Sequence, residues 1–148
     1  MEPTVEPPRR QDAKKDAKGA EPSLALDYTA RQIVDGALAV HRTLGPGLLE
    51  SVYEHCLAYE LEKRGLSVAR QVVTPIRYEE LFIETGFRMD LIVDDCVIIE
   101  IKSVERLLAI HEAQLLTYLK ITNHRLGLLI NFNVPRLRDG LKRLIHSP

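Results

Sequence analysis

Residues 87–103, FRMDLIVDDCVIIEIKS, decide how the rest of the chain is arranged. Two apolar runs flank the polar segment Asp94-Asp95-Cys96, which is typical of a buried β-hairpin. Charged residues nevertheless stand among these apolar neighbours, and burying an unpaired charge has a high free-energy cost. The pattern therefore predicts a hairpin whose charged residues are either paired or chemically active. These residues are Arg88, Asp90, Glu100 and Lys102.

The register of this hairpin determines whether its two central carboxylates meet. Glu100 and Lys102 share one face of their strand, because side chains alternate along a strand. A three-residue loop at 94–96 places Asp90 opposite Glu100, whereas a two-residue loop puts the two acids on opposite faces. The sequence leaves both loops open, so the candidate site requires the loop with an odd number of residues.

Two carboxylates that converge repel each other as anions, and a divalent cation relieves this repulsion. Asp90 and Glu100 are therefore the candidate ligands of Mg²⁺ or Mn²⁺. Lys102 is the candidate group that orients a bound water or stabilises the transition state. We expect Arg88 either to contact a scissile phosphate or to pair with Asp90. A purely structural ion-pair network of these residues is the alternative.

Helical spacing of apolar residues predicts two helices before the hairpin. The first runs from Asp27 to the helix breakers at 45–47, with His41 as a packing residue on its apolar face. The second continues to about Arg64, with Glu50 at the edge of its buried stripe. That stripe is expected to contain Leu49, Val52, Tyr53, Cys56 and Leu57.

The remaining elements complete a mixed sheet. Strands are predicted at 68–78, 81–93, 97–103 and 126–132, with a helix at 109–123 between the last two. The last strand–helix–strand unit predicts a parallel pair with a right-handed crossover, and the earlier strands join antiparallel through short turns. The expected fold is therefore α/β, with a mixed sheet flanked by helices.

Two further segments carry polar groups that could meet a substrate. The helix at 109–123 is apolar around most of its circumference, apart from the aligned residues His111, Gln114 and Tyr118. Each alone could be a satisfied core residue, but three in one strip indicate a helix that positions a site and its substrate. The basic end, 136–146, is expected to be a short helix that either contacts phosphates or is a solvated charged face.

Several blocks of the sequence resemble the GxxExxY protein family, which is assigned to the PD-(D/E)XK nuclease-like superfamily. These blocks are GLLESVY at 47–53, the hairpin at 87–103, HEAQLLTYLK at 111–120 and GLLINF at 127–132, in the family's order. The resemblance covers roughly residues 28–133. It implies a restriction-endonuclease-like fold.

The resemblance also implies roles for single residues. Asp90, Glu100 and Lys102 take the catalytic positions of the D…ExK arrangement. Glu50 takes the helix carboxylate that completes the metal site in related nucleases, and Tyr53 belongs to the same motif as a substrate-binding or positioning residue. The Gln114…Tyr118 pair resembles the QxxxY motif of exonuclease-type members.

The leading interpretation is a Mg²⁺- or Mn²⁺-dependent nuclease, with DNA as the expected substrate. The rival is a non-catalytic module on the same fold that binds nucleic acid or protein, because a fold does not dictate function. The domain has no obvious DNA-reading element, so a homodimer or a protein partner could be needed to hold the substrate.

The composition and charge of the chain limit these interpretations. The 148 residues carry a formal net charge of −1, so only a local basic groove could attract nucleic acid. Two cysteines without CxxC spacing favour a reducing cytoplasm, and no apolar run is long enough for a membrane span. Residues 1–26 contain half of the eight prolines and balanced charges, which predicts a disordered tail before a domain at 27–148.

Overall fold

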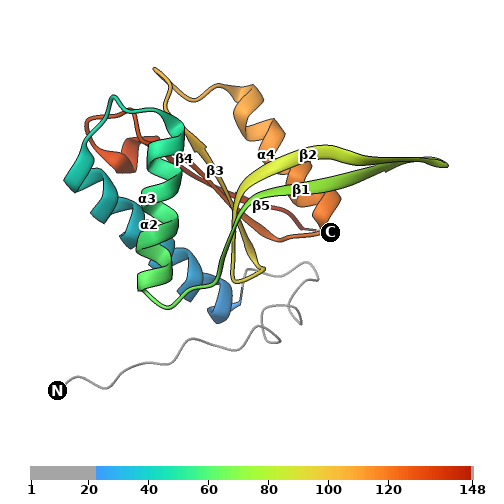
Figure 1. Ribbon diagram of the computed structural model, residues 1–148, viewed down its shortest axis with the longest axis horizontal. Helices are drawn as coiled ribbons and strands as arrows, with labels where there is room; N and C mark the ends of the chain where they lie inside the picture. The colour runs from blue at the N-terminus through green and yellow to red at the C-terminus, as the bar shows by residue number, and fades with distance from the viewer. Residues whose placement is uncertain (1–22, 148) are drawn as a thin grey trace.

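The computed structural model describes residues 23–147, which form a five-stranded mixed sheet with helices on both faces (Figure 1). The strand order is β1-β2-β3-β4-β5, with β3 and β4 parallel and all other neighbours antiparallel. This arrangement confirms the predicted α/β fold and the parallel strand–helix–strand unit. The elements are α2 (Leu24–Leu44), α3 (Glu50–Lys63), β1 (Val68–Tyr78), β2 (Leu81–Val93), β3 (Val97–Lys102), α4 (Ala109–Thr122), β4 (Leu126–Asn131), the 3₁₀ turn η1 (Leu137–Gly140) and β5 (Leu141–Ile145).

The core is divided between the two faces of the sheet. Leu91, Ile99 and Leu128 belong to the cluster under α2 and α3, whereas Ile98 and Leu129 belong to the cluster under α4. This division follows from the alternation of side chains along each strand. The central strands β3 and β4 are therefore covered on both sides, as their continuous apolar sequences require.

The first helix begins three residues before its expected start at Asp27. The Ser23 hydroxyl caps it by accepting the N–H of Leu26 at 3.3 Å, and Leu26 is buried. Residues 24–26 are therefore part of the helix and not of the predicted tail. The rest of that tail, residues 1–22, lies outside the described residues and stays a prediction. Within residues 23–147, the structure has no helix long and apolar enough to cross a membrane.

The buried stripe of α3 lies further round the helix than the sequence indicated. Leu49 is 75% exposed and Val52 is 37% exposed, so their predicted burial is wrong. The residues that are buried on α3 are Tyr53, Glu54, Leu57, Ala58 and Leu61. This rotation carries the carboxylate of Glu54 into the interior of the domain.

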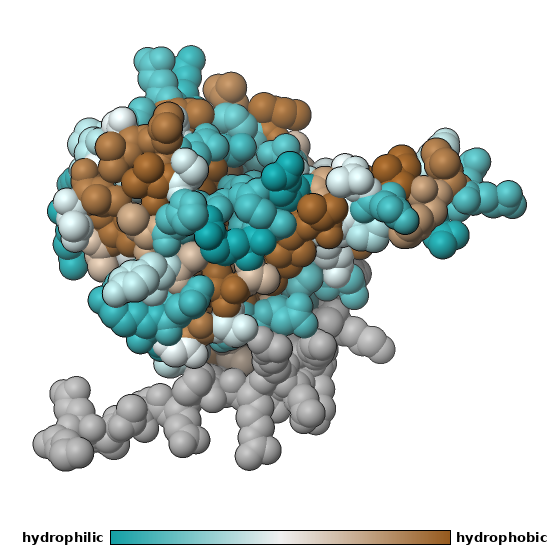
Figure 2. All heavy atoms as spheres, viewed as in Figure 1, coloured by the Kyte–Doolittle hydropathy of each residue, from teal (hydrophilic) through white to brown (hydrophobic). Residues whose placement is uncertain are grey.

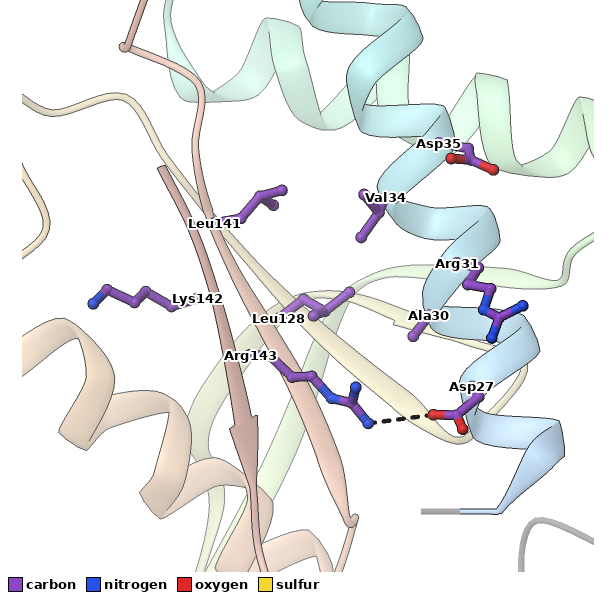
Figure 3. A pocket seen from close by; sticks show the side chains of 9 residues that line it. All are labelled: Asp27, Ala30, Arg31, Val34, Asp35, Leu128, Leu141, Lys142 and Arg143. Atoms are coloured by element: carbon purple, nitrogen blue, oxygen red, sulfur yellow. Dashed lines mark hydrogen bonds and ion pairs between the residues drawn. The ribbon is translucent and has the colours of Figure 1, made fainter. Parts of the chain in front are cut away.

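The basic end of the chain is a strand and not the predicted helix. After the turn η1, β5 pairs antiparallel with β4, and Leu141 and Leu144 are half-buried. Hydrogen bonding to the neighbouring strand decides the structure here, because a short apolar and basic run fits either element. The groove between α2 and β5 has a volume of about 490 Å³, and Figure 3 shows Arg143 bonded across it to Asp27 at 3.3 Å.

The strands β1 and β2 continue past the rest of the sheet as a two-stranded arm (Figure 1). The register of β2 with β3 covers only Leu91 to Val93, whereas β1 accompanies β2 along its whole length. The register of the arm shifts between Thr74 and Ile76, opposite Gly86. A Cβ at Gly86 would overlap the side chain of Ile76, so this position of β2 requires glycine.

Candidate active site

The hairpin has the odd-length loop that the candidate site requires. Val93 pairs with Val97 and Leu91 pairs with Ile99, which leaves 94–96 as a three-residue loop. The loop residues Asp94 and Asp95 adopt left-handed backbone angles, with φ of 50° and 54°, and aspartate tolerates this region better than most residues. Continued by one residue, this register places Asp90 opposite Glu100, as the candidate site requires.

Asp90 and Glu100 each bond to the backbone of the other's strand. The N–H of Asp90 donates to Oε1 of Glu100 at 3.1 Å, and the N–H of Ile101 donates to Oδ2 of Asp90 at 2.8 Å. These bonds lie just past Leu91, where the pairing of β2 with β3 ends. Backbone donors therefore fix the orientation of both carboxylates at the point where the two strands separate.

Burial makes this carboxylate pair hard to ionise. Burial, followed by repulsion from Asp90, raises the pKa of Glu100 to about 8. Burial also raises the pKa of Asp90, and Glu54 adds to this, while the N–H of Ile101 and the charge of Lys102 oppose it. Without a cation, the pair therefore holds a proton at neutral pH.

The donor set fits a hard divalent cation that keeps most of its water. Within residues 23–147, no group of three or more His, Cys, Asp or Glu side chains could hold a metal ion. The protein would therefore supply the two carboxylates of Asp90 and Glu100. Mg²⁺ commonly binds in this way, with waters and substrate phosphate oxygens in its other positions.

Glu54 is the site residue that sequence reasoning missed. Its side chain is 8% exposed and accepts hydrogen bonds from Arg70 Nη2, at 2.9 Å, and from Gln71 Nε2. Its charge acts on the pKa of Asp90, so the two carboxylates lie in the same region. A signal was present, because Glu54 stands three and seven residues before the buried Leu57 and Leu61.

Glu50, the helix carboxylate expected to complete the metal site, begins α3 and is exposed. It accepts the N–H of Ser103 at 3.2 Å, and the Ser103 hydroxyl donates to the carbonyl of Leu48 at 2.6 Å. These bonds attach the start of α3 to the segment that directly follows Lys102. The role of Glu50 as a metal ligand stays a prediction.

Tyr53 is fully buried beneath the loop that precedes α3. Its hydroxyl donates to the carbonyl of Gly45 at 2.6 Å and accepts the N–H of Leu48 at 3.1 Å. Its ring stacks on Phe132, with 4.5 Å between the ring centroids. Tyr53 thus positions the segment that borders the site, and its burial leaves no surface for substrate contact.

Replacing Tyr53 with Phe should destabilise the protein by about 1–3 kcal/mol, because the two hydrogen bonds of its hydroxyl to Gly45 and Leu48 are lost, each worth about 0.5–1.5 kcal/mol. Denaturant unfolding measures this loss, and divalent-metal binding should persist. Tyr59→Phe is the matched control, since Tyr59 is 70% exposed and should show no change in stability. Equal stability of the two variants would contradict the assigned role.

The predicted polar strip on α4 divides into residues with different surroundings. Tyr118 stacks on Phe87 with 4.4 Å between centroids, and its pKa is raised by burial and then by Glu100 and Asp90. His111 accepts the N–H of Leu108 through Nδ1 at 3.0 Å and so caps the helix. Gln114 is exposed. Of the three, Tyr118 is the one whose pKa the charges of Glu100 and Asp90 affect.

Arg88 is exposed and does not pair with Asp90. Its Nη1 donates to Oε1 of Gln71 at 3.3 Å, and Gln71 in turn donates to Glu54. The register places Gln71 opposite Asp90, and its backbone is left-handed with φ of 51°. The result is a hydrogen-bonded chain from α3 through β1 to β2 that runs beside Asp90.

The family model of the PD-(D/E)XK nuclease superfamily matches residues 27–144, and the chain therefore belongs to this superfamily. The matched range extends from α2 into β5 and contains Asp90, Glu100 and Lys102. Members are typically metal-dependent, and membership implies a nucleic-acid substrate. No curated protein and no solved structure matches the chain.

Proposed function

We propose that the protein hydrolyses phosphodiester bonds of nucleic acid in a metal-dependent reaction, with DNA as the substrate. The observation that carries this proposal is the pair formed by half-buried Asp90 and buried Glu100, whose carboxylates each accept a hydrogen bond from the other's strand. An ordinary surface ion pair joins two opposite charges in solvent, whereas this arrangement brings two acids together. The GLLESVY motif at 47–53 supports placing the chain in the GxxExxY family within the superfamily.

In this proposal, Asp90 and Glu100 hold Mg²⁺ or Mn²⁺. The cation supplies a water of lowered pKa and offsets negative charge on the phosphate. Lys102, two residues after Glu100 on β3, orients the attacking water and stabilises charge that develops on the phosphate. The exposed guanidinium of Arg88 contacts a substrate phosphate, and Tyr118 helps to position the acids.

Isothermal titration calorimetry with Mg²⁺ and Mn²⁺ tests the metal site directly. The wild type is expected to bind the cation, and Asp90→Ala and Glu100→Ala are each expected to abolish binding. Because phosphate oxygens complete the coordination of Mg²⁺ in such sites, the titration is repeated with an uncleavable DNA analogue. A wild type that binds no metal under either condition would remove the basis of the proposed reaction.

Two carboxylates of α3, those of Glu50 and Glu54, provide a matched pair of variants for the same titration. Glu54→Gln should weaken metal binding more than Glu50→Gln, because the charge of Glu54 acts on Asp90 while Glu50 bonds to Ser103. A removed charge near the cation reduces its electrostatic attraction. The reverse order would identify Glu50 as the helix carboxylate of the site.

One observation favours the alternative of a non-catalytic binding module. Within residues 23–147, no third His, Cys, Asp or Glu side chain joins Asp90 and Glu100 in a group that could hold a metal ion, which leaves a minimal ligand set. A binding module would retain DNA in the presence of chelator and of Mg²⁺ alike, without cleaving it. A protein partner and a cytoplasmic location stay predictions from the sequence.

A further inference from the structure

Gln71 has a backbone conformation that is unusual inside a strand. Its φ is 51°, in the left-handed region that residues other than glycine, asparagine and aspartate rarely adopt. Gln71 lies within β1, whereas the other non-glycine residues of positive φ among residues 23–147 lie in turns or at a helix end, namely Glu79, Asp94, Asp95 and Asn123. Strain of this kind inside a regular element indicates a functional constraint.

The strained angle coincides with a change of face in both strands. Arg70 and Gln71 are consecutive in β1, and in a regular strand their side chains would point to opposite faces. Both nevertheless bond to Glu54 of α3. In β2, Leu91 pairs with Arg70 and packs under α2 and α3, whereas Met89 packs under α4. The left-handed angle therefore turns the side chain of Gln71 to the side of α3.

The amide of Gln71 joins a carboxylate to a guanidinium beside Asp90. Its Nε2 donates to Oε1 of Glu54, and its Oε1 accepts from Nη1 of Arg88 at 3.3 Å. An amide makes both bonds at once because it has a donor end and an acceptor end. A glutamate at this position would repel Glu54, and a lysine would repel Arg88. The neutral side chain of Gln71 is therefore suited to hold both groups.

The two arginines next to this amide differ in how their charges are compensated. Arg70 forms an ion pair with Glu54 at 2.9 Å. Arg88 is exposed, and within the described part of the chain it bonds to a neutral amide and forms no ion pair. Figure 2 shows hydrophilic residues gathered where the arm leaves the body of the domain. An oriented guanidinium whose charge is not compensated suits a phosphate, because its planar fork matches two phosphate oxygens.

We propose that Gln71 is a positioning residue that orients Arg88 toward a phosphate of nucleic acid bound at Asp90 and Glu100. The proposal rests on the proposed function, which makes nucleic acid the ligand of this site. Orientation before binding matters because a free arginine side chain loses rotamer freedom when it contacts a phosphate, and this loss weakens affinity. The strained backbone of Gln71 supplies the orientation, since it sets the amide between Glu54 and Arg88.

Fluorescence anisotropy with an uncleavable DNA analogue and Mg²⁺ tests this role without any measurement of cleavage. Arg88→Gln should weaken binding by about ten-fold, the size expected for one hydrogen bond to a charged group. Gln71→Asn should weaken binding by about two- to ten-fold, because its shorter side chain cannot reach both partners and leaves Arg88 unoriented. Asparagine adopts left-handed angles more readily than glutamine, so the backbone of this variant should be preserved.

A second variant and a matched control accompany this measurement. Gln71→Gly removes both hydrogen bonds, and glycine adopts the left-handed angle without strain, so it should weaken binding as Gln71→Asn does. Gln32→Asn is the control, because Gln32 on α2 is half-buried and also accepts a hydrogen bond from an arginine, Arg64, at 3.4 Å. It should bind the analogue as the wild type does. Circular dichroism checks that each variant is folded.

A double variant separates the positioning of Arg88 from a general effect on structure. Gln71→Asn/Arg88→Gln should bind as weakly as Arg88→Gln alone, because the two substitutions remove one shared interaction. Additive losses in the folded double variant, or wild-type affinity of both Gln71→Asn and Gln71→Gly, would overturn the role of Gln71 and leave the proposed function standing. A wild type that does not bind the DNA analogue would overturn the proposed function and the role of Gln71 with it.

Discussion

Lys102→Met is expected to reduce metal-dependent cleavage on the order of 10²–10³-fold while leaving metal binding intact. Lys102 is half-buried at the end of β3, and its charge lowers the pKa of both Asp90 and Glu100. In the proposed reaction its charge acts mainly on the phosphate and the attacking water. The loss should therefore fall on kcat, with little change in KM.

Lys142→Met is the matched control for this variant. Lys142 is exposed on β5, and Figure 3 shows its side chain directed away from α2. We expect cleavage by Lys142→Met to equal that of the wild type. If Lys102→Met and Lys142→Met lose activity equally, Lys102 acts by general electrostatic attraction of nucleic acid and not through chemistry at the site.

The second large expected effect is on the stability of the metal-free protein. The folded protein holds a proton on Glu100 up to about pH 8, whereas the unfolded chain releases it near its ordinary value of about 4.3. Between these values the native state binds the extra proton, so the free energy of unfolding falls as the pH rises. The total fall is on the order of a few kcal/mol.

Glu100→Gln should remove most of this pH dependence and make the metal-free protein more stable at pH 8 than the wild type. Urea unfolding with chelator present, from pH 5 to pH 8, measures both effects. Glu50→Gln is the control, because Glu50 is exposed and should leave the pH dependence unchanged. If the free energy of unfolding of Glu100→Gln depends on pH as strongly as that of the wild type, Glu100 is not the acid that causes this dependence.

The position of the acid pair was predictable because it depends on chain connectivity. Side chains alternate strictly along strands, so the loop length alone decides whether Asp90 meets Glu100. The charged residues within an apolar hairpin then point to the site. The sequence could not choose between the two loops, and the observed pairing of Val93 with Val97 settles that choice.

The spacing of Glu54 from Leu57 and Leu61 indicates its burial, but its place near Asp90 was not predictable from the sequence, and neither was the strand β5. Glu50 and Glu54 stand one helical turn apart, and the packing of α3 on the sheet decides which of them reaches Asp90. For β5, short apolar and basic runs fit a helix or a strand equally well, and pairing with β4 decides between them. Both outcomes depend on tertiary contacts that local spacing does not encode.

The most direct test of the central claim is a cleavage assay with wild type and Asp90→Asn on single-stranded DNA, double-stranded DNA and RNA, with Mg²⁺, Mn²⁺ or chelator. The account predicts cleavage of at least one substrate by the wild type, loss of that cleavage in chelator, and none by Asp90→Asn. Cleavage by Asp90→Asn at the wild-type rate, or no cleavage by the wild type of any of these substrates, would contradict it.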